Sequence, residues 1–321
     1  MATNRKAKTP KPPKTRRRYS IGEWYGSPFE TISPAERFRN ARAEMETDTI
    51  RGLDCPFQKN RICSKKGGVC SLRRYEQTGE AAVSMSGPLV TTCPNRFLEK
   101  GAIFKWIGEK LLGTDRPIIL RQVGFLNRFP SVADVPSDDE GDSRDFIGRI
   151  DHVLVHPTKQ PLDWCPVELQ AVYFSGKSMR REFNMLSQSV LSAIPFPAEQ
   201  RRPDWRSSGP KRLLPQLQTK VPDIANWAKK MAVVVDEAFF DAFFGPNVPF
   251  ERQKHLSLAQ VAWCVVKYVK SGNRWRLEPK EIVLSKLDSS VKALTGGVPL
   301  SREQFEGQLL EKLPASFSKR R

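Results

Sequence analysis

The 321-residue sequence has no long hydrophobic run. Its longest apolar stretches, at 231–235 and 261–266, are far shorter than the roughly 20 residues that a membrane-spanning helix needs. Acids are also scarce, with 35 Asp and Glu against 53 Lys and Arg. The first of these shortages excludes a helical membrane protein. The second leaves a formal charge of +18 and favours a polyanion as the partner. Disorder of the whole chain is excluded, because 39% hydrophobic residues suffice for a buried core.

The N-terminal residues are basic and contain no acid. Residues 1–21 include eight Lys or Arg and three Pro, a composition typical of a flexible arm. Such an arm either lies along nucleic-acid phosphates or only keeps the protein soluble, and the composition fits both roles. No apolar segment follows these basic residues, so we expect a cytoplasmic protein whose thiols stay reduced.

Hydrophobic periodicity predicts an α/β protein. The pattern indicates strands at 118–126, 146–156, 165–174, 231–235 and 261–269, and helices at 97–112, 178–194 and 302–313. Residues 51–95 are rich in Cys and Gly and have too few apolar residues to form a core unaided. We therefore expect a flexible arm at 1–21, a four-cysteine metal module with the segment that leads into it at 22–96, and an α/β core at 97–321.

Four of the six cysteines fall within 39 residues. Thiolates are soft ligands, and four of them would hold zinc, a single iron or an iron–sulfur cluster. The gaps of seven, six and 22 residues match none of the familiar paired spacings, so four unrelated reduced thiols remain the alternative. The candidate ligands are Cys55, Cys63, Cys70 and Cys93, whereas Cys165 and Cys264 lie in apolar strands and are expected in the core.

Two acids interrupt otherwise apolar strands. Asp151 lies in the strand at 146–156, and Glu168 and Gln170 lie two residues apart in the next strand, so that their side chains share a face. An acid in the centre of a strand is costly unless it is paired or bound to metal. Two carboxylates and a backbone carbonyl suit Mg²⁺. The alternative is an exposed strand face with scattered polar residues.

These motifs resemble those of the PD-(D/E)XK nucleases, in which an Asp on one strand precedes Glu-X-Lys or Glu-X-Gln on the next. The chain is more similar still to NotI-like type II restriction endonucleases. Members of that family carry a four-cysteine iron module ahead of the nuclease core, with Cys-Pro-Phe and Gly-Val-Cys elements like those at Cys55 and Cys70. Their Ile-Asp-His and Val-Glu-Leu-Gln-Ala strands correspond here to 150–152 and 167–171, and the motifs span roughly residues 50–180. Gln in place of Lys agrees with this subfamily.

The resemblance implies a restriction-endonuclease-like mixed sheet flanked by helices and Mg²⁺-dependent, site-specific cleavage of double-stranded DNA at a GC-rich palindrome. Asp151, Glu168 and the Leu169 carbonyl would hold Mg²⁺, and Gln170 would orient the attacking water. One structural iron, rather than zinc, would occupy the four-cysteine site. A homodimer would cut both strands. A cognate DNA methyltransferase, not a stable subunit, would belong to the same restriction–modification system of a prokaryotic cell.

Other titratable residues could join such a site. A further acid from the helix before the core often does so, and Glu99 or Glu109 could serve, although either fits a solvated helix face. His152 and His156 could act as metal ligands or as a general base. Strand alternation turns His152 away from Asp151, and hydrogen-bonded histidines are the commoner case, so we favour a structural role for both.

The helix expected at 178–194 follows the proposed catalytic strand and carries polar residues on one side. Arg pairs bidentately with guanine and Asn or Gln with adenine, so these residue types could read a major groove. An ordinary solvated face is the alternative, because most basic contacts go to phosphates. The candidates for DNA reading are Arg180, Arg181, Asn184 and Gln188.

Two other functions account for part of the pattern. A non-enzymatic, zinc-stabilised DNA-binding or regulatory protein explains the charge and the thiols but leaves Asp151 and Glu168 without a role. A repair nuclease with an iron–sulfur cluster explains the acids, but its thiols would typically flank the nuclease core on both sides. Here all four clustered thiols precede it, so a site-specific endonuclease is the preferred interpretation.

Overall fold

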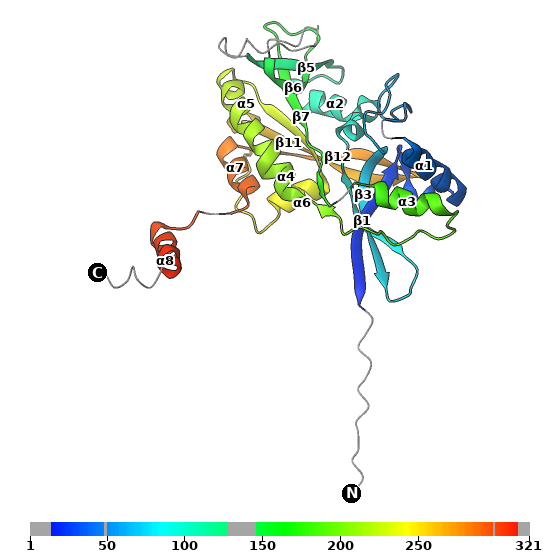
Figure 1. The fold of residues 1–321 in the computed structure, drawn as a ribbon. Coiled ribbons are helices and arrows are strands. Elements are labelled where there is room, and N and C mark those ends of the chain that lie inside the picture. The colour runs from blue at the N-terminus through cyan, green and yellow to red at the C-terminus, as the bar shows by residue number, and fades with distance from the viewer. Residues whose placement is uncertain (1–13, 48–49, 128–145, 177, 298, 314–321) are drawn as a thin grey trace, which may run out of the picture.

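A six-stranded mixed sheet forms the centre of the computed structural model, which describes residues 14–47, 50–127, 146–176, 178–297 and 299–313 (Figure 1). The strand order is β12-β11-β10-β7-β6-β5. β10 runs parallel to both β7 and β11, and the other pairs are antiparallel. The strands are β5 (Ile118–Asn127), β6 (Phe146–Val155), β7 (Trp164–Leu169), β10 (Met231–Asp236), β11 (Val261–Ser271) and β12 (Arg274–Ser285). The predicted α/β class and mixed sheet are confirmed.

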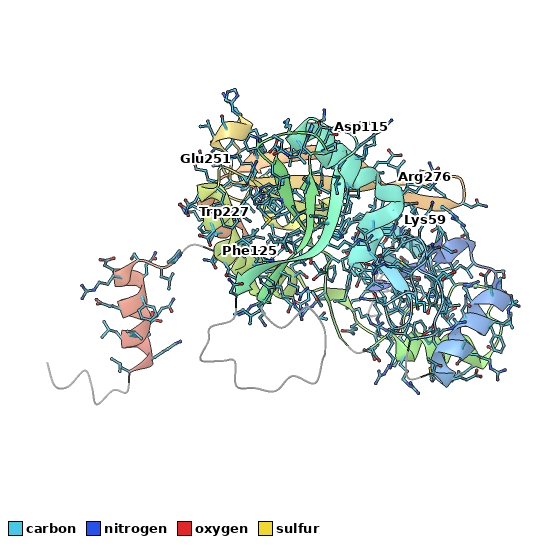
Figure 2. The ribbon with its side chains drawn as sticks, turned by 90° about the horizontal axis from the view of Figure 1, so that it is seen from above. Lys59, Asp115, Phe125, Trp227, Glu251 and Arg276 are labelled. Carbon is cyan, nitrogen blue, oxygen red and sulfur yellow. The ribbon has the colours of Figure 1, made fainter. Side chains whose placement is uncertain are left out.

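Helices cover both faces of this sheet, which explains why every residue of β10 is buried. One face packs against α5 (Leu214–Asn226), α6 (Glu237–Phe244) and α7 (Leu287–Thr295), and the other against α2 (Ala102–Ile107). Alternate residues of β10 enter the two cores: Val233 packs among the side chains of the first group and Val234 among those of the second. At one end of the sheet, Phe125 and Trp227 lie 5.9 Å apart between ring centroids (Figure 2).

A second, four-stranded sheet precedes the central one in the chain. Its order is β2-β1-β3-β4. It comprises β1 (Thr15–Trp24), β2 (Ser27–Pro28), β3 (Val69–Thr78) and β4 (Ser84–Thr91), packed with α1 (Pro34–Glu46) and α3 (Arg180–Gln188). Residues 15–21, expected to belong to a flexible arm, therefore lie in a strand. Cross-strand partners make this possible, because Arg17 pairs with Glu76 at 2.9 Å and Arg16 donates to Gln77. Residues 1–13 of the expected arm lie outside the described residues.

Buried charges join the two sheets. The guanidinium of Arg96 lies 3.0 Å from Glu23 of β1, and both side chains are fully buried. Arg96 also donates to the Trp275 carbonyl of β12. At the end of β4, the Thr91 N–H donates to Asp236 at 2.6 Å, and the same carboxylate caps α6 through Phe239 N–H. The cysteine-bearing segment is thus fixed against the central sheet.

Two expected helices are shorter than the periodicity suggested. The segment 97–112 divides into η2 (Pro94–Gly101), α2 and η3 (Gly108–Leu112), because Lys100 and Gly101 both adopt positive φ. α3 ends at Gln188 instead of 194, where Ser189 becomes extended. The remaining elements are η1 (Phe29–Thr31), β8 (Phe174–Ser175), β9 (Arg202–Pro203), α4 (Trp205–Ser208), η5 (Gly209–Leu213), η6 (Leu256–Leu258) and α8 (Arg302–Lys312).

The closing helix α8 agrees with the expected 302–313 and begins with a capping box at Ser301. It stands apart from the two sheets in both views and has no buried residue (Figures 1 and 2). None of the helices described is long and apolar enough to cross a membrane.

Candidate active site

The two strand acids meet across a strand pair. β6 and β7 are antiparallel, and the last paired positions are His152 and Val167. One step further along this register, Asp151 stands opposite Glu168, so the two side chains lie on the same face. The Asp151 carboxylate accepts a hydrogen bond from the Leu169 N–H at 3.1 Å. The two acids that the sequence singled out are therefore neighbours.

Glu168 is buried beside a lysine that the sequence did not single out. Its side chain is 4% exposed, and its Oε1 lies 2.6 Å from the Nζ of Lys220 on α5. Burial and the neighbouring Asp151 charge raise the pKa of Glu168 to about 7, against the lowering effect of Lys220. Lys220 also donates to the Arg149 carbonyl at 2.7 Å. The carboxylate pair thus shares a buried counter-charge.

Asp151 has a second partner in Gln122 of the neighbouring strand β5. The Gln122 amide nitrogen lies 3.4 Å from Asp151 Oδ1, and the Gln122 carbonyl accepts a hydrogen bond from Arg149 at 3.3 Å. Gln122 has a φ of 50°, a backbone conformation that costs a non-glycine residue about 1–3 kcal/mol and recurs at functional sites. The strain turns this side chain towards the acid opposite it.

A cleft with a volume of about 340 Å³ opens beside Asp151. One wall comes from the end of β7 and the residues after it, including Gln170, and the opposite wall comes from the cysteine-bearing segment, with Lys65 and Asn95. Gln170 is 8% exposed, and its backbone N–H donates to Val234 of β10. Gln170 therefore borders the cleft, one residue beyond the end of β7.

An aromatic and an arginine close one end of the cleft. Arg212 lies 3.9 Å over the ring of Tyr173 and donates to its hydroxyl at 2.8 Å. Arg212 is on the π-helical turn η5, which begins at Gly209, where a Cβ would lie only 2.4 Å from the Phe243 ring. The close approach requires glycine there, and the turn brings an exposed positive charge to the cleft.

The histidines and upstream acids differ in their relation to the cleft. His152 is among the residues that line it, but it is buried against the Phe104 ring, 4.8 Å between centroids, and burial lowers its pKa. His156 accepts hydrogen bonds from the N–H groups of two following residues, the structural role we favoured. Glu99 pairs with Arg96 at 2.8 Å and Glu109 approaches Lys105 at 3.9 Å. Neither acid is among the described residues that line the cleft.

The four clustered cysteines are all buried free thiols. Cys55, Cys63 and Cys70 pack into one small cluster, and the Cys93 N–H donates to the Cys70 carbonyl at 3.2 Å. Burial raises the pKa of Cys63, Cys70 and Cys93, and neighbouring thiols raise each further. Within the ranges that the structure describes, no three His, Cys, Asp or Glu side chains are arranged to hold a metal ion. The described residues therefore show buried thiols but not the expected metal-binding cysteine module.

The other two cysteines lie where the sequence placed them. Cys165 and Cys264 are buried in β7 and β11 and belong to the core beneath α2. The candidate DNA-reading residues lie on α3, away from the cleft: all four are exposed, and none is among its described lining residues. Of these, Arg181 forms an ion pair with Glu199. α3 packs instead against the N-terminal sheet, where Phe183 stacks on Trp24 at 5.3 Å.

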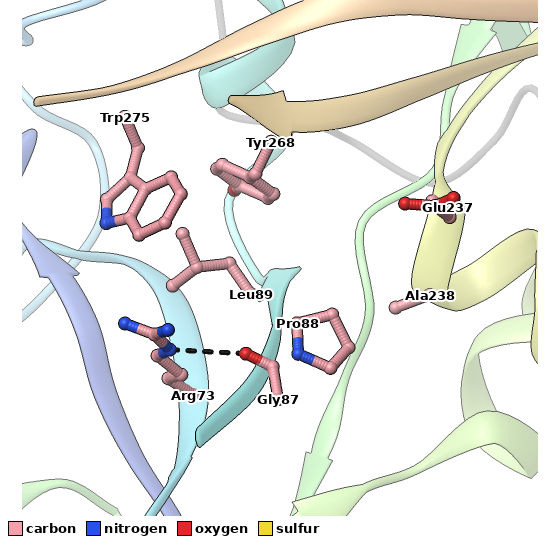
Figure 3. Close-up of a pocket in the computed structure, with 8 residues that line it drawn as sticks. All are labelled: Arg73, Gly87, Pro88, Leu89, Glu237, Ala238, Tyr268 and Trp275. Atoms are coloured by element: carbon pink, nitrogen blue, oxygen red, sulfur yellow. Dashed lines mark hydrogen bonds between the residues drawn. The ribbon is translucent and has the colours of Figure 1, made fainter. Parts of the chain in front are cut away.

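A separate hollow of about 220 Å³ lies between β4, β11, β12 and α6 (Figure 3). Arg73 donates to the Gly87 carbonyl at its edge and lies 5.3 Å from the Trp275 ring. Glu237, the acid in this hollow, is already paired with Lys280 at 2.7 Å. The hollow lacks the paired carboxylates of the cleft, so the cleft is the candidate active site.

Sequence reasoning missed Lys220 and Gln122. For Lys220 there was a signal, because this charged residue falls between Leu217, Val221 and Ile224 on the apolar side of a helix. A lysine at such a position needs a buried partner. No comparable signal exists for Gln122, whose role follows from its backbone conformation and from the pairing of β5 with β6.

The comparisons with known proteins agree with this geometry. The family model described as "Restriction endonuclease NotI" matches residues 38–277, most of the chain, including the four clustered cysteines, the carboxylate pair and five of the six strands of the central sheet in full. No curated protein matches the sequence at a significant level. The match favours neither a zinc-stabilised regulator nor an iron–sulfur repair nuclease. The chain therefore belongs to the NotI restriction endonuclease family and is a site-specific deoxyribonuclease that acts on double-stranded DNA.

Proposed function

We propose that this type II restriction endonuclease hydrolyses DNA phosphodiester bonds in the cleft beside Asp151 and depends on Mg²⁺. The observation that carries the proposal is the pair of Asp151 and Glu168, two carboxylates held together at the cleft although their like charges repel. Both carboxylates and the Leu169 carbonyl are hard oxygen donors that fit Mg²⁺. When bound, Mg²⁺ supplies the positive charge that acidifies the attacking water and neutralises the scissile phosphate.

The residues around the pair have distinct roles in this proposal. Gln170 orients the water by hydrogen bonding and cannot act as a base, because an amide has no basic site at neutral pH. Gln122 and the Leu169 N–H fix the Asp151 carboxylate. Lys220 fixes Glu168 and offsets its charge. The proton of the water passes to solvent or to a phosphate oxygen.

The finer specificity is proposed from the resemblance to the NotI-like enzymes. We propose a GC-rich palindrome as the target, cut on both strands by a two-fold homodimer. The exposed side chains of α3 are the candidates for base contacts. An enzyme of this kind would also cut the DNA of its own cell. We therefore propose that it works in the cytoplasm of a prokaryote beside a cognate methyltransferase that is not a stable subunit.

Cleavage of phage or plasmid DNA tests the catalytic proposal. The wild-type protein with Mg²⁺ should produce discrete bands, and Asp151→Asn should abolish them while leaving DNA binding intact. Asp115→Asn is a matched control, because Asp115 is an exposed acid near Lys105, outside the described lining of the cleft. Retention of cleavage by Asp151→Asn, or an equal loss in the control variant, would contradict the assignment.

We further propose that the thiol cluster binds one metal ion, iron by the family resemblance and zinc as the alternative. Cys55, Cys63 and Cys70 pack into one cluster, and Cys93 is joined to Cys70 through a backbone hydrogen bond. Soft thiol donors suit either ion, although side-chain shifts would be needed to gather them around it.

Burial raises the pKa of Cys63, Cys70 and Cys93, so a bound ion would be the source of the thiolates. Metal analysis of the purified protein, with its absorption spectrum, should give one ion per chain and distinguish an iron–thiolate site from colourless zinc. Cys63→Ser should lose the ion and lower the melting temperature. Cys165→Ala, in the core, should keep the ion. Protein that holds no iron or zinc and is insensitive to chelators would contradict the proposal.

A further inference from the structure

A groove lined by arginines lies beside the active-site cleft. Its volume is about 590 Å³, larger than that of the cleft. The start of β1 supplies Arg16, Arg17 and Arg18, and the short pair of β8 and β9 supplies Ser175 and Arg202. We call this surface the arginine groove. It combines residues that are far apart in the sequence, so its charge density could not be seen in the composition.

The arginine groove continues from the cleft along one face of β8. Tyr173 lines the cleft and Ser175 lines the groove. Residues two apart on an extended chain point to the same side and lie about 7 Å apart. Between them, Phe174 points the other way and packs on the Tyr19 ring, 5.8 Å between centroids. Ser175 is paired with Arg202 across the strands, so the two hollows border a single surface.

The charge of the groove is held in place but only partly neutralised. Arg18 donates to the carbonyls of Pro197 and Ala198 at 2.7 Å each, and Arg16 lies 4.7 Å over the Phe196 ring. These partners fix the guanidinium groups without cancelling their charge. Arg17 is paired with Glu76 at 2.9 Å, but its side chain is 63% exposed.

Arg202 adds a further exposed charge at the β9 side of the groove. Its neighbour Arg201 has a different role: it is buried and forms an ion pair with Glu182, which holds the β9 segment against α3. Fixed cations on an open surface suit a ligand that carries regularly spaced negative charges, and the DNA backbone presents one phosphate per roughly 3.4 Å of axis on each strand. A single small anion would leave most of this surface unused.

We propose that the arginine groove binds the sugar–phosphate backbone of the same duplex whose scissile phosphate enters the cleft. This inference rests on the proposed function of the cleft. The duplex runs from the carboxylate pair past Tyr173 and Ser175 to the start of β1. Contacts of this kind position the DNA and add salt-dependent affinity without reading its sequence.

The test compares two double variants that remove the same charge. The groove variant, Arg16→Gln with Arg202→Gln, removes two exposed positive charges from the arginine groove. The control variant, Arg39→Gln with Arg276→Gln, removes two exposed positive charges from α1 and β12. Binding of each protein to a 40-base-pair duplex is measured without Mg²⁺ by fluorescence anisotropy between 50 and 200 mM salt. The salt slope of log K should fall by about two for the groove variant and stay near the wild-type value for the control.

That change in slope means that wild-type binding weakens about 12-fold more than binding by the groove variant over this salt range. Arg16→Lys with Arg202→Lys keeps the charge and should restore the slope, which separates charge from folding. Equal slopes for groove and control variants overturn the inference. The binding assay does not measure cleavage, so the two proposals can fail separately. A wild-type protein that does not cut DNA refutes the proposed function, whereas the salt slope alone tests whether the arginine groove binds DNA.

Discussion

Replacement of Lys220 by Met removes a positive charge from the candidate active site while keeping most of the volume of the side chain. Lys220 Nζ lies 2.6 Å from Glu168 and 2.7 Å from the Arg149 carbonyl, and the lysine is 6% exposed. Loss of an opposite charge at this distance raises the pKa of a buried carboxyl by roughly two. The pKa of Glu168 should therefore rise from about 7 to roughly 9 in Lys220→Met.

The stability of the variant then depends on pH in a definite direction. Burial already raises the pKa of Glu168 above its ordinary value of 4.5 in the folded protein, so the folded state binds this proton more tightly than the unfolded chain does. The contribution of Glu168 protonation to the free energy of unfolding is fully present below pH 4.5. In the wild-type protein this contribution is lost as pH rises to about 7. In Lys220→Met the loss continues to roughly pH 9.

Urea unfolding of both proteins measures this difference. At pH 6 the free energies of unfolding should differ by only about 1 kcal/mol, the contribution of the lost hydrogen bonds. Between pH 6 and 9.5 the gap should widen by about 2.5 kcal/mol, because about 1.4 kcal/mol accompanies each tenfold change in proton affinity. Cleavage at pH 7 should fall by about 50-fold, since the ionised fraction of Glu168 drops from about one half to about one in a hundred.

Two controls separate this effect from damage to the fold. Lys229→Met removes a lysine from a partly exposed pair with Asp163 and should cost less than about 1 kcal/mol, with no widening above pH 6. In a Glu168→Gln background, adding Lys220→Met should also give no widening, because the titrating group is gone. The coupling of Lys220 to Glu168 would be refuted if the difference in unfolding free energy between the wild-type protein and Lys220→Met stayed constant from pH 6 to 9.5, or if Lys220→Met cleaved DNA at the wild-type rate at pH 7.

Three further predictions concern the cleft and the N-terminal sheet. At limiting Mg²⁺, cleavage by the wild-type enzyme should rise as pH increases through about 7, because only ionised Glu168 binds the ion; a rate that is flat from pH 6 to 8 contradicts this. Glu23→Gln leaves the fully buried Arg96 without its main counter-charge and should lower the free energy of unfolding by about 3–5 kcal/mol in urea. Gly68→Ala places a Cβ 2.2 Å from the Tyr25 ring at a φ of +60° and should cost about 2–4 kcal/mol by the same assay. A cost below about 1 kcal/mol for either substitution would contradict the packing described.

Most of the central sheet could be predicted because its strands are apolar and β-branched. The expected strand at 118–126 is β5, and that at 231–235 is β10, to within one residue at either end. β1 was missed because three arginines follow its first residue, and its stability depends on partners such as Glu76 on a strand distant in the sequence. Residue periodicity does not record such cross-strand pairs.

The candidate site, like the fold, could be predicted only in part. Asp151 and Glu168 stand out because charged residues interrupt apolar strands, and the register brings them together. The contacts that complete the site depend on tertiary packing instead. Gln122 approaches Asp151 through a strained backbone turn, and Lys220 approaches Glu168 from a helix 52 residues away in the chain. Local sequence reasoning supplies the acids but not their partners.

Glu-X-Lys nucleases carry a lysine two residues after the Glu, and this chain has Gln170 there instead. The position of Lys220 bears on which residues could take over the role of that lysine. Gln170 borders the cleft, whereas Lys220 is buried beside Glu168, and neither of these two is among the described residues of the cleft wall. The Lys220 ammonium group contacts Glu168 and the Arg149 carbonyl. It can hold Glu168 and offset its charge before the metal ion arrives. Arg212, stacked on Tyr173, brings an exposed positive charge to the cleft. In the proposed mechanism, a buried lysine would orient the carboxylate and an exposed arginine would stabilise the phosphate, two functions that one lysine combines in Glu-X-Lys sites.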